Sequence, residues 1–162
     1  MNKPSRWIWM GGLAVVVLLV ATPWTLRGRM HRLSEEDLDT ARSVWRRSGV
    51  RDYDLDVEIS GATAGRYSIV VRDGRLQSIE RDGRPANPAE SDQWTVEGLF
   101  KTIDRELQMA WDGARAMRLP EGVQLVILGR FDPTLGYPID YVRQVTGSGS
   151  SVRIRVHGLV QR

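Results

Sequence analysis

Three acidic side chains alternate along one short segment and are the first residues whose spacing suggests chemistry. Asp54, Asp56 and Glu58 stand two positions apart, and carboxylate oxygens are the ligands that calcium favours. In an extended strand this spacing separates successive carboxylates by about 6 to 7 Å, which is wide for one ion. Arg66 and Arg72 are expected on the neighbouring strand. We therefore expect a solvated, partly ion-paired strand face and no metal site.

Two further segments resemble known chemistry only superficially. His157 alternates with Arg153 and Arg155, but a catalytic base needs a positioned nucleophile or acid, and no local motif supplies one. We read these three residues as charge that protects a sheet edge, with contact to an anionic surface or partner as the alternative. The glycine-rich run at 146–151 has no following lysine or helix, so it predicts a hairpin turn and not a phosphate loop.

The segment FDPTLGYP at 131–138 predicts a rigid turn. Its two prolines fix local backbone angles, and its glycine can adopt positive φ, which would hold the following tyrosine in a defined place. The aspartate can accept backbone hydrogen bonds in an Asx-type turn. A packed structural turn and a presented recognition loop both remain open. The candidate residues are Asp132, Pro133, Gly136, Tyr137 and Pro138.

Composition narrows the classes of function. The 162 residues contain no cysteine, which excludes disulfides, thiolate metal sites, a nucleophilic cysteine and a lipid-modified one. The net charge of +3 is unevenly distributed, because residues 1–32 hold five basic and no acidic side chains, leaving 18 basic and 20 acidic in 33–162. A net acidic domain without a known module argues against nucleic-acid binding. Without a catalytic constellation, we expect neither an enzyme nor a cofactor.

The N-terminal region predicts a single membrane anchor. Residues 7–24 are uncharged and, as a helix, would span about 27 Å, close to the thickness of a bilayer core. Trp7 and Trp9 stand at one boundary and Trp24 at the other, where tryptophan is enriched. A short basic tail at 1–6 precedes the anchor, and a basic juxtamembrane linker at 25–33 follows it.

Two alternatives to the anchor are a cleaved signal peptide and a buried core helix. Cleavage is disfavoured because the candidate pairs Leu19/Ala21 and Val20/Thr22 are poor sites and Pro23 follows directly. A core helix is disfavoured by the length of the apolar run. Both flanks are basic, so the positive-inside rule does not fix the orientation. Because the tail is short and a folded domain follows, we expect the tail in the cytoplasm and residues 34–162 outside it.

Residues 34–162 predict an α+β domain. Ser34 can cap a helix that Gly49 closes, with Leu38, Ala41, Val44 and Trp45 on its buried face. Thr95 caps a second helix, whose apolar positions reach Leu107 and which we expect to end near Trp111, with that ring in the core. The segments that alternate apolar and polar residues, or are strongly apolar, predict strands at 53–60, 66–72, 75–80, 123–131, 139–145 and 152–160.

Short turns between these segments imply an antiparallel arrangement. We expect the order αβββαβββ, with a meandering sheet of about six strands covered on one face by two helices and the last three strands at its centre. Pairing Ile59 with Tyr67 places Asp54 opposite Arg72. Asp73-Gly74 predicts a tight turn into a strand with a bulge or an edge, and the polar run at 81–93 predicts a loop.

Several short segments together resemble an uncharacterised bacterial family catalogued as domain of unknown function 6174. The matching pieces are Trp45 with Tyr53, GRYSIVV at 65–71 before Asp73-Gly74, TVEGLF at 95–100 and FDPTLGYP at 131–138. The resemblance spans about residues 38–160. It implies a small exported protein held by a lipidated cysteine or one membrane helix, with no assigned activity. Because this chain lacks cysteine, the resemblance implies that the helix is the anchor.

These patterns predict a single-pass protein of the cell membrane. We expect an extracytoplasmic domain that interacts with a protein or another envelope component, and no nucleic-acid partner. The alternative is a domain that binds a small ligand, or acts as an enzyme, in a pocket between the sheet and the helices. Converging Asp, Glu, Tyr and Arg side chains would favour that alternative.

Overall fold

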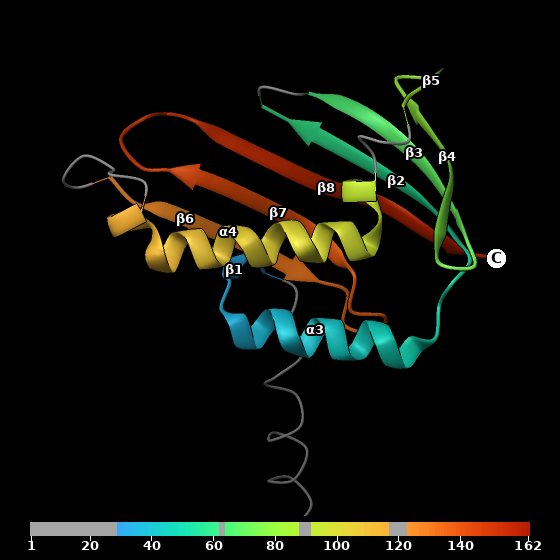
Figure 1. The fold of residues 1–162 in the computed structure, drawn as a ribbon, viewed down its shortest axis with the longest axis horizontal. Helices are drawn as coiled ribbons and strands as arrows, with labels where there is room; N and C mark the ends of the chain where they lie inside the picture. Colours follow the sequence, from blue (N-terminus) through green and yellow to red (C-terminus); the bar gives the residue numbers. More distant parts are fainter. Residues whose placement is uncertain (1–28, 62–63, 88–91, 117–122) are drawn as a thin grey trace, which may run out of the picture.

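The described part of the chain is one antiparallel sheet with two helices on one face (Figure 1). The computed structural model describes residues 29–61, 64–87, 92–116 and 123–162. The helices are α3 (Glu35–Ser48) and α4 (Val96–Ala116), with the 3-10 turn η2 (Asp92–Trp94) before α4. The strands are β1 (His31–Arg32), β2 (Tyr53–Ser60), β3 (Gly65–Arg72), β4 (Arg75–Arg81), β5 (Arg84–Pro85), β6 (Leu125–Phe131), β7 (Pro138–Val145) and β8 (Ser151–Gln161). The α+β class is confirmed.

The sheet has eight strands instead of about six, in the order β1-β6-β7-β8-β2-β3-β4-β5. The two additional strands, β1 and β5, are two residues long and extend the two edges. The prediction that the last three strands form the centre is wrong. In this order β6 is second from one edge, and only β8 reaches the middle, beside β2.

The first hairpin keeps its predicted faces but not its predicted register. Tyr67 pairs with Val57 and not with Ile59, because β3 begins at Gly65, which lies opposite Ile59. The shift is two residues, and an even shift leaves each side chain on the same face. Strand β4 follows the Asp73-Gly74 turn, in which both residues have positive φ, and its pairing with β3 contains the expected irregularity.

Helix α3 matches its sequence signals. Ser34 and Asp37 form a reciprocal capping box at its start, and Gly49 ends it with φ of 68°. The helix buries Leu38, Ala41 and Trp45 against the sheet. Burial of a large side chain contributes roughly 1.5 to 3 kcal/mol, so this face attaches α3 firmly to the core.

Helix α4 differs from its prediction at the C-terminal end. It passes through Asp112-Gly113 and continues to Ala116, since one glycine inside a helix costs only about 1 kcal/mol relative to alanine. Trp111 is 77% exposed, so its predicted place in the core is wrong. Each residue of a helix is rotated by about 100° around the helix axis from the one before it. Trp111, eight residues after Ile103, therefore points about 80° away from the direction of Ile103. Trp111 therefore lies beside the buried stripe of α4, whereas Leu107 lies on it.

Two short strands arise within segments that the sequence assigns to loops. Asp82 and Gly83 both have positive φ and make a tight turn from β4 to β5, within the predicted loop at 81–93. His31 and Arg32 pair with β6, and the Leu33 amide donates to the Ile127 carbonyl over 3.0 Å. The end of the predicted linker is thus part of the sheet.

No helix within the described ranges is both long and apolar enough to cross a membrane. The predicted anchor at 7–24, including Trp7, Trp9 and Trp24, lies outside those ranges.

Candidate functional site

Two open hollows adjoin along the N-terminal half of α4 and share Glu97 and Lys101. One, of about 810 Å³, lies between α4 and the turn from β3 to β4. The other, of about 550 Å³, lies between α4 and the C-terminal end of α3. We call the two together the α4 groove. Its charged residues are Arg42, Arg46, Arg51, Arg75, Glu97, Lys101 and Arg105.

Glu97 is held between the two hollows by hydrogen bonds to buried aromatic side chains. The Trp45 indole Nε1 donates to Oε1 over 2.9 Å, and the Tyr53 hydroxyl donates to Oε2 over 3.1 Å. That hydroxyl also accepts from the Val96 amide over 3.1 Å. Burial, and then the charge of Glu97, raise the pKa of Tyr53, so the hydroxyl stays protonated and remains a donor.

The start of α4 adds to this arrangement. The Thr95 side chain accepts from the Gly98 amide over 3.1 Å and caps the helix, while Glu97 lies in the first turn, where a negative charge is favourable. Both Glu97 oxygens already have donors. The carboxylate therefore fixes the first turn of α4 against Trp45 and Tyr53, and it is not arranged as a general base.

The basic residues of the groove differ in how far their charge is neutralised. Arg42 contacts Asp104 over 2.9 Å and lies over the Phe100 ring, 5.9 Å from its centroid. Within the described residues, no ion pair joins a carboxylate to any of the other basic residues of the groove, which are Arg46, Arg51, Arg75, Lys101 and Arg105. The groove therefore has excess positive charge, which suits an anionic ligand.

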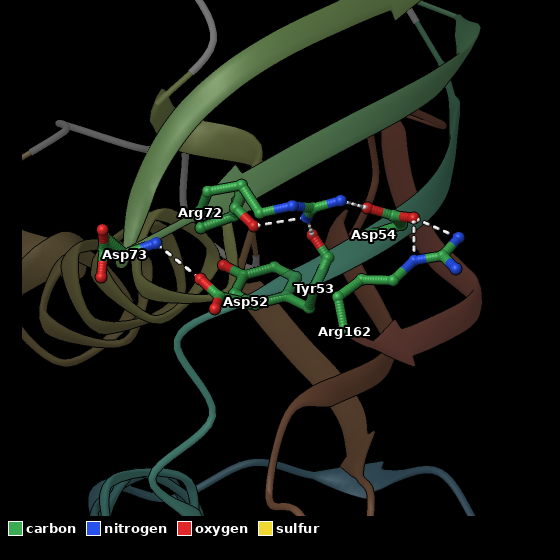
Figure 2. A network of polar contacts seen from close by, with 7 residues as sticks. Asp52, Tyr53, Asp54, Arg72, Asp73 and Arg162 are labelled. Atoms are coloured by element: carbon green, nitrogen blue, oxygen red, sulfur yellow. Dashed lines mark hydrogen bonds and ion pairs between the residues drawn. The ribbon is translucent and has the colours of Figure 1, made fainter.

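The acidic strand residues have polar or charged partners on the sheet face opposite the helices. Asp54 lies between Arg72, at 2.8 Å, and Arg162, at 2.6 Å (Figure 2). Hydrogen bonds from these two arginines hold the pKa of Asp54 below its usual value. Asp56 accepts from the Ser68 hydroxyl over 2.9 Å. Among the described residues, no group of three or more His, Asp or Glu side chains could hold a metal ion.

The basic alternation of the last strand also has acidic partners. Arg153 makes two hydrogen bonds to Asp140, of 2.8 and 2.6 Å, and Arg155 approaches the same carboxylate at 3.7 Å. His157 contacts Glu58 at 2.6 Å. Asp140 is only 4% exposed, so this carboxylate is strongly tied to its arginines. The charges on this face are largely matched, unlike those of the α4 groove.

The residues at 131–138 form a compact turn packed against α3. Asp132 Oδ1 accepts from the amides of Thr134 and Leu135 over 2.9 and 2.7 Å, which is the Asx-type arrangement. Gly136 has φ of 82°, and a Cβ there would collide with the Ala41 carbonyl. Tyr137 is half-buried, and burial, followed by the charge of Asp132, raises its pKa.

The rest of this turn lies at the rim of a separate hollow. Pro133 is exposed and Pro138 is buried at the start of β7. With part of α3, the turn lines a hollow of about 340 Å³ on the side of that helix away from the α4 groove. The fold therefore brings Asp132, Pro133, Gly136, Tyr137 and Pro138 together, but not into the groove.

Sequence reasoning did not identify the α4 groove. Arg46 lies outside the predicted buried face of the first helix, while Arg75 and Lys101 come from elements distant in the sequence. The only signal in the sequence was the segment TVEGLF at 95–100, which predicts the start of a helix and carries a glutamate among apolar residues. Nothing in that segment indicates which charges surround it.

Part of the chain matches a known protein family. Residues 37–115 match the model of a family of unknown function (DUF6174), which confirms the resemblance over that part of the chain. The match contains all the charged residues of the α4 groove and ends before the turn at 131–138. The wider resemblance, to about residue 160, is not covered by it. No curated protein and no solved structure match the chain.

Proposed function

We propose that this chain, part of which belongs with a family of unassigned function, is a membrane-anchored interaction domain. Its α+β part lies outside the cytoplasm, and its α4 groove binds an acidic segment of another envelope protein. The observation that carries this proposal is the excess positive charge of the groove. Exposed basic side chains that form no ion pair favour association with an anionic partner and speed their encounter.

The anchor in this proposal is the apolar segment at 7–24. Its length, its tryptophans and the absence of charge support a membrane helix. The described chain begins five residues after Trp24 and enters the sheet at β1. The folded domain would thus be tied closely to the bilayer.

The position of the groove supports a partner in water and not the bilayer itself. Helices α3 and α4 run antiparallel, since Trp45 contacts Glu97 and Arg42 contacts Asp104. The groove lies at the C-terminal end of α3, and the 14 residues of that helix span about 21 Å from its start next to β1. The groove is therefore about 21 Å along α3 from the point where the chain enters the fold, which leaves room for a partner in water.

A small anionic ligand is the alternative, and the size of the larger hollow favours it. At about 810 Å³ it falls within the range of small-molecule sites, which is roughly 300 to 1,000 Å³. Its lining contains Glu97, Arg75 and Arg105 but neither Asp nor Tyr, so it matches only part of the Asp, Glu, Tyr and Arg set that would favour a ligand pocket. We favour the acidic segment because the positive charge extends over both hollows and exceeds what one small anion covers.

The test uses the full chain in nanodiscs of zwitterionic lipid and a fluorescent peptide of ten glutamates as the probe. Anisotropy should report saturable binding that weakens as salt is added. The double variant Lys101→Glu, Arg105→Glu should bind about tenfold more weakly or worse, a difference of about 1.4 kcal/mol. Arg84→Glu is the matched control, because Arg84 is exposed on β5 and lies outside the groove.

Each outcome decides between the alternatives. Equal binding by the double variant and the control would mean that the groove is not the site. Displacement of the peptide by low concentrations of inorganic phosphate, with loss in the double variant, would favour the small-ligand alternative. Absence of peptide binding at low salt would contradict the proposal.

A further inference from the structure

Trp111 is an exposed aromatic ring beside the strand where the chain enters the fold. Among the described residues, the only large hydrophobic side chains that stand exposed are Trp111 and Val160. Trp111 lines a hollow of about 420 Å³ together with Arg32 and Leu33 from the N-terminal strand region and Leu125 and Ile127 from β6. Exposure of most of an indole ring to water is unfavourable in free energy, and such exposed apolar surface often marks contact with a membrane or a partner protein.

The entry point of the chain limits how far this ring can be from the proposed anchor. Five residue steps separate Trp24 from Arg29, and an extended chain of that length spans at most about 18 Å. Arg29 leads directly into β1, which is fixed to β6 by its pairing of His31 with Gly129. The β1 edge, with Trp111 beside it, must therefore lie near the bilayer if the segment at 7–24 spans it.

The chemistry of this edge suits lipid headgroups. Tryptophan is enriched at membrane interfaces because its ring is apolar and its N–H is polar. Arg29 and Arg32 are exposed, and within the described residues no ion pair joins either of them to a carboxylate. Basic residues beside a membrane helix are attracted to anionic lipids by roughly 1 kcal/mol each.

We propose that Trp111 and the β1 edge rest in the headgroup region of an anionic bilayer and make a second contact beside the anchor. This inference depends on the membrane anchoring in the proposed function, but not on what the α4 groove binds. A second contact restricts rotation of the domain about its tether. Because Trp111 is near the C-terminal end of α4, the α4 groove along the N-terminal half of that helix is farther from this contact.

The absence of cysteine allows a single label to test this contact in the full chain. Gln108→Cys places a label on an exposed position one helical turn from Trp111, and Gln77→Cys places the same label on β4, near the opposite edge of the sheet. Both proteins are reconstituted in vesicles of phosphatidylethanolamine and phosphatidylglycerol. An environment-sensitive NBD group is attached, and its emission is measured with ordinary and with brominated lipids.

The label at 108 should lose most of its emission when the lipids are brominated, whereas the label at 77 should keep its emission. Trp111→Ala in the Gln108→Cys protein should restore much of the lost emission, because the ring no longer holds the helix at the interface. Replacing phosphatidylglycerol with phosphatidylcholine should also reduce quenching, because the attraction of Arg29 and Arg32 is lost. A thermal melt of the Trp111→Ala protein checks that the fold is retained.

The results separate failure of this inference from failure of the anchor. If the full chain does not float with the vesicles, the anchor is absent and the inference falls with it. If the chain floats but the label at 108 is quenched by aqueous iodide and not by brominated lipid, the anchor stands and the lipid contact is wrong. A label protected from both quenchers would show that protein covers Trp111, either other residues of this chain or a second copy, and would also overturn the inference.

Discussion

The rings of Trp45 and Tyr53 meet edge to face with their centroids 5.5 Å apart, and both donate hydrogen bonds to Glu97. Trp45 comes from α3, Tyr53 from the start of β2 and Glu97 from the first turn of α4. This contact therefore joins both helices to the sheet at the floor of the α4 groove. Edge-to-face pairs add about 0.5 to 1.5 kcal/mol beyond their buried area.

Removing the Tyr53 hydroxyl should weaken this junction. Tyr53→Phe leaves the buried Val96 amide without its acceptor and Glu97 without one donor, so we expect the free energy of unfolding to fall by about 1 to 3 kcal/mol. Urea denaturation of the full chain in detergent measures the change. Tyr67→Phe is the control, since its hydroxyl makes no hydrogen bond to another described residue. An equal loss in both variants would contradict the role of the Glu97 contact.

Gly136 should tolerate no side chain, because two separate effects oppose one. Its φ of 82° strains any L-residue, and a Cβ would also lie 2.9 Å from the Trp45 amide nitrogen. We expect Gly136→Ala to lower the free energy of unfolding by about 3 kcal/mol, the sum of backbone strain and overpacking. Gly149→Ala separates the two effects, since Gly149 has φ of 66° but open space around it.

In the Gly149→Ala protein, backbone strain alone should lower the free energy of unfolding, by about 1 to 2 kcal/mol. Thermal melts of both variants provide the comparison. Equal losses would mean that the turn at 131–138 is not packed tightly on α3. The interpretation of this turn as a presented loop would then gain support.

The buried carboxylate of Glu106, on α4, should make the stability of the fold depend on pH. Its Oε2 atom has no hydrogen-bond partner among the described residues. Burial raises its pKa above the ordinary 4.5, opposed by the charge of Arg143, whose guanidinium is 3.5 Å away. The folded protein thus holds this proton more tightly than the unfolded chain. The free energy of unfolding should therefore fall as the pH rises from 4.5 through the raised pKa.

Glu106→Gln cannot lose a proton and should remove this part of the pH dependence. Compared with the unaltered protein, the variant should gain stability between pH 4 and pH 7.5, as measured by urea denaturation at both values. The exposed Glu80→Gln, on β4, serves as the matched control. If Glu106→Gln changes the free energy of unfolding by the same amount at both pH values, burial of the carboxylate is not the cause.

Local signals predicted the elements well because each depends on neighbouring residues. Ser34, Asp37 and Gly49 define α3 by capping, and the alternation from Tyr53 to Ile59 defines the buried face of β2. The hairpin register was less secure, since its faces are the same after a two-residue shift. The Asp82-Gly83 turn has the same signal as Asp73-Gly74 and was predictable, but the polar run around it favoured a loop.

The candidate site was not predictable, because it depends on the packing of distant elements. Arg46 lies in the last turn of α3, Arg75 begins β4 and Lys101 lies on α4, so only the folded chain brings their charges to one groove. The same holds for Asp140, whose burial depends on Arg153 of the next strand. Charge counts along the sequence cannot distinguish such matched charges from unmatched ones.

Membrane insertion and orientation give the last prediction. If residues 7–24 span the bilayer with the basic tail in the cytoplasm, the full chain should stay with the membrane during alkaline carbonate extraction. Alkaline phosphatase fused after Arg162 should then be active, because this enzyme folds only outside the cytoplasm. A green fluorescent protein fused at the same place and exported unfolded should stay dark.

Replacing Val16 and Leu18 with lysine is the matched control and should release the chain, since a charge at the centre of a membrane helix costs about 3 kcal/mol on insertion scales. Fluorescence without phosphatase activity in a membrane-bound protein would reverse the orientation, because the domain and its α4 groove would then lie on the cytoplasmic side.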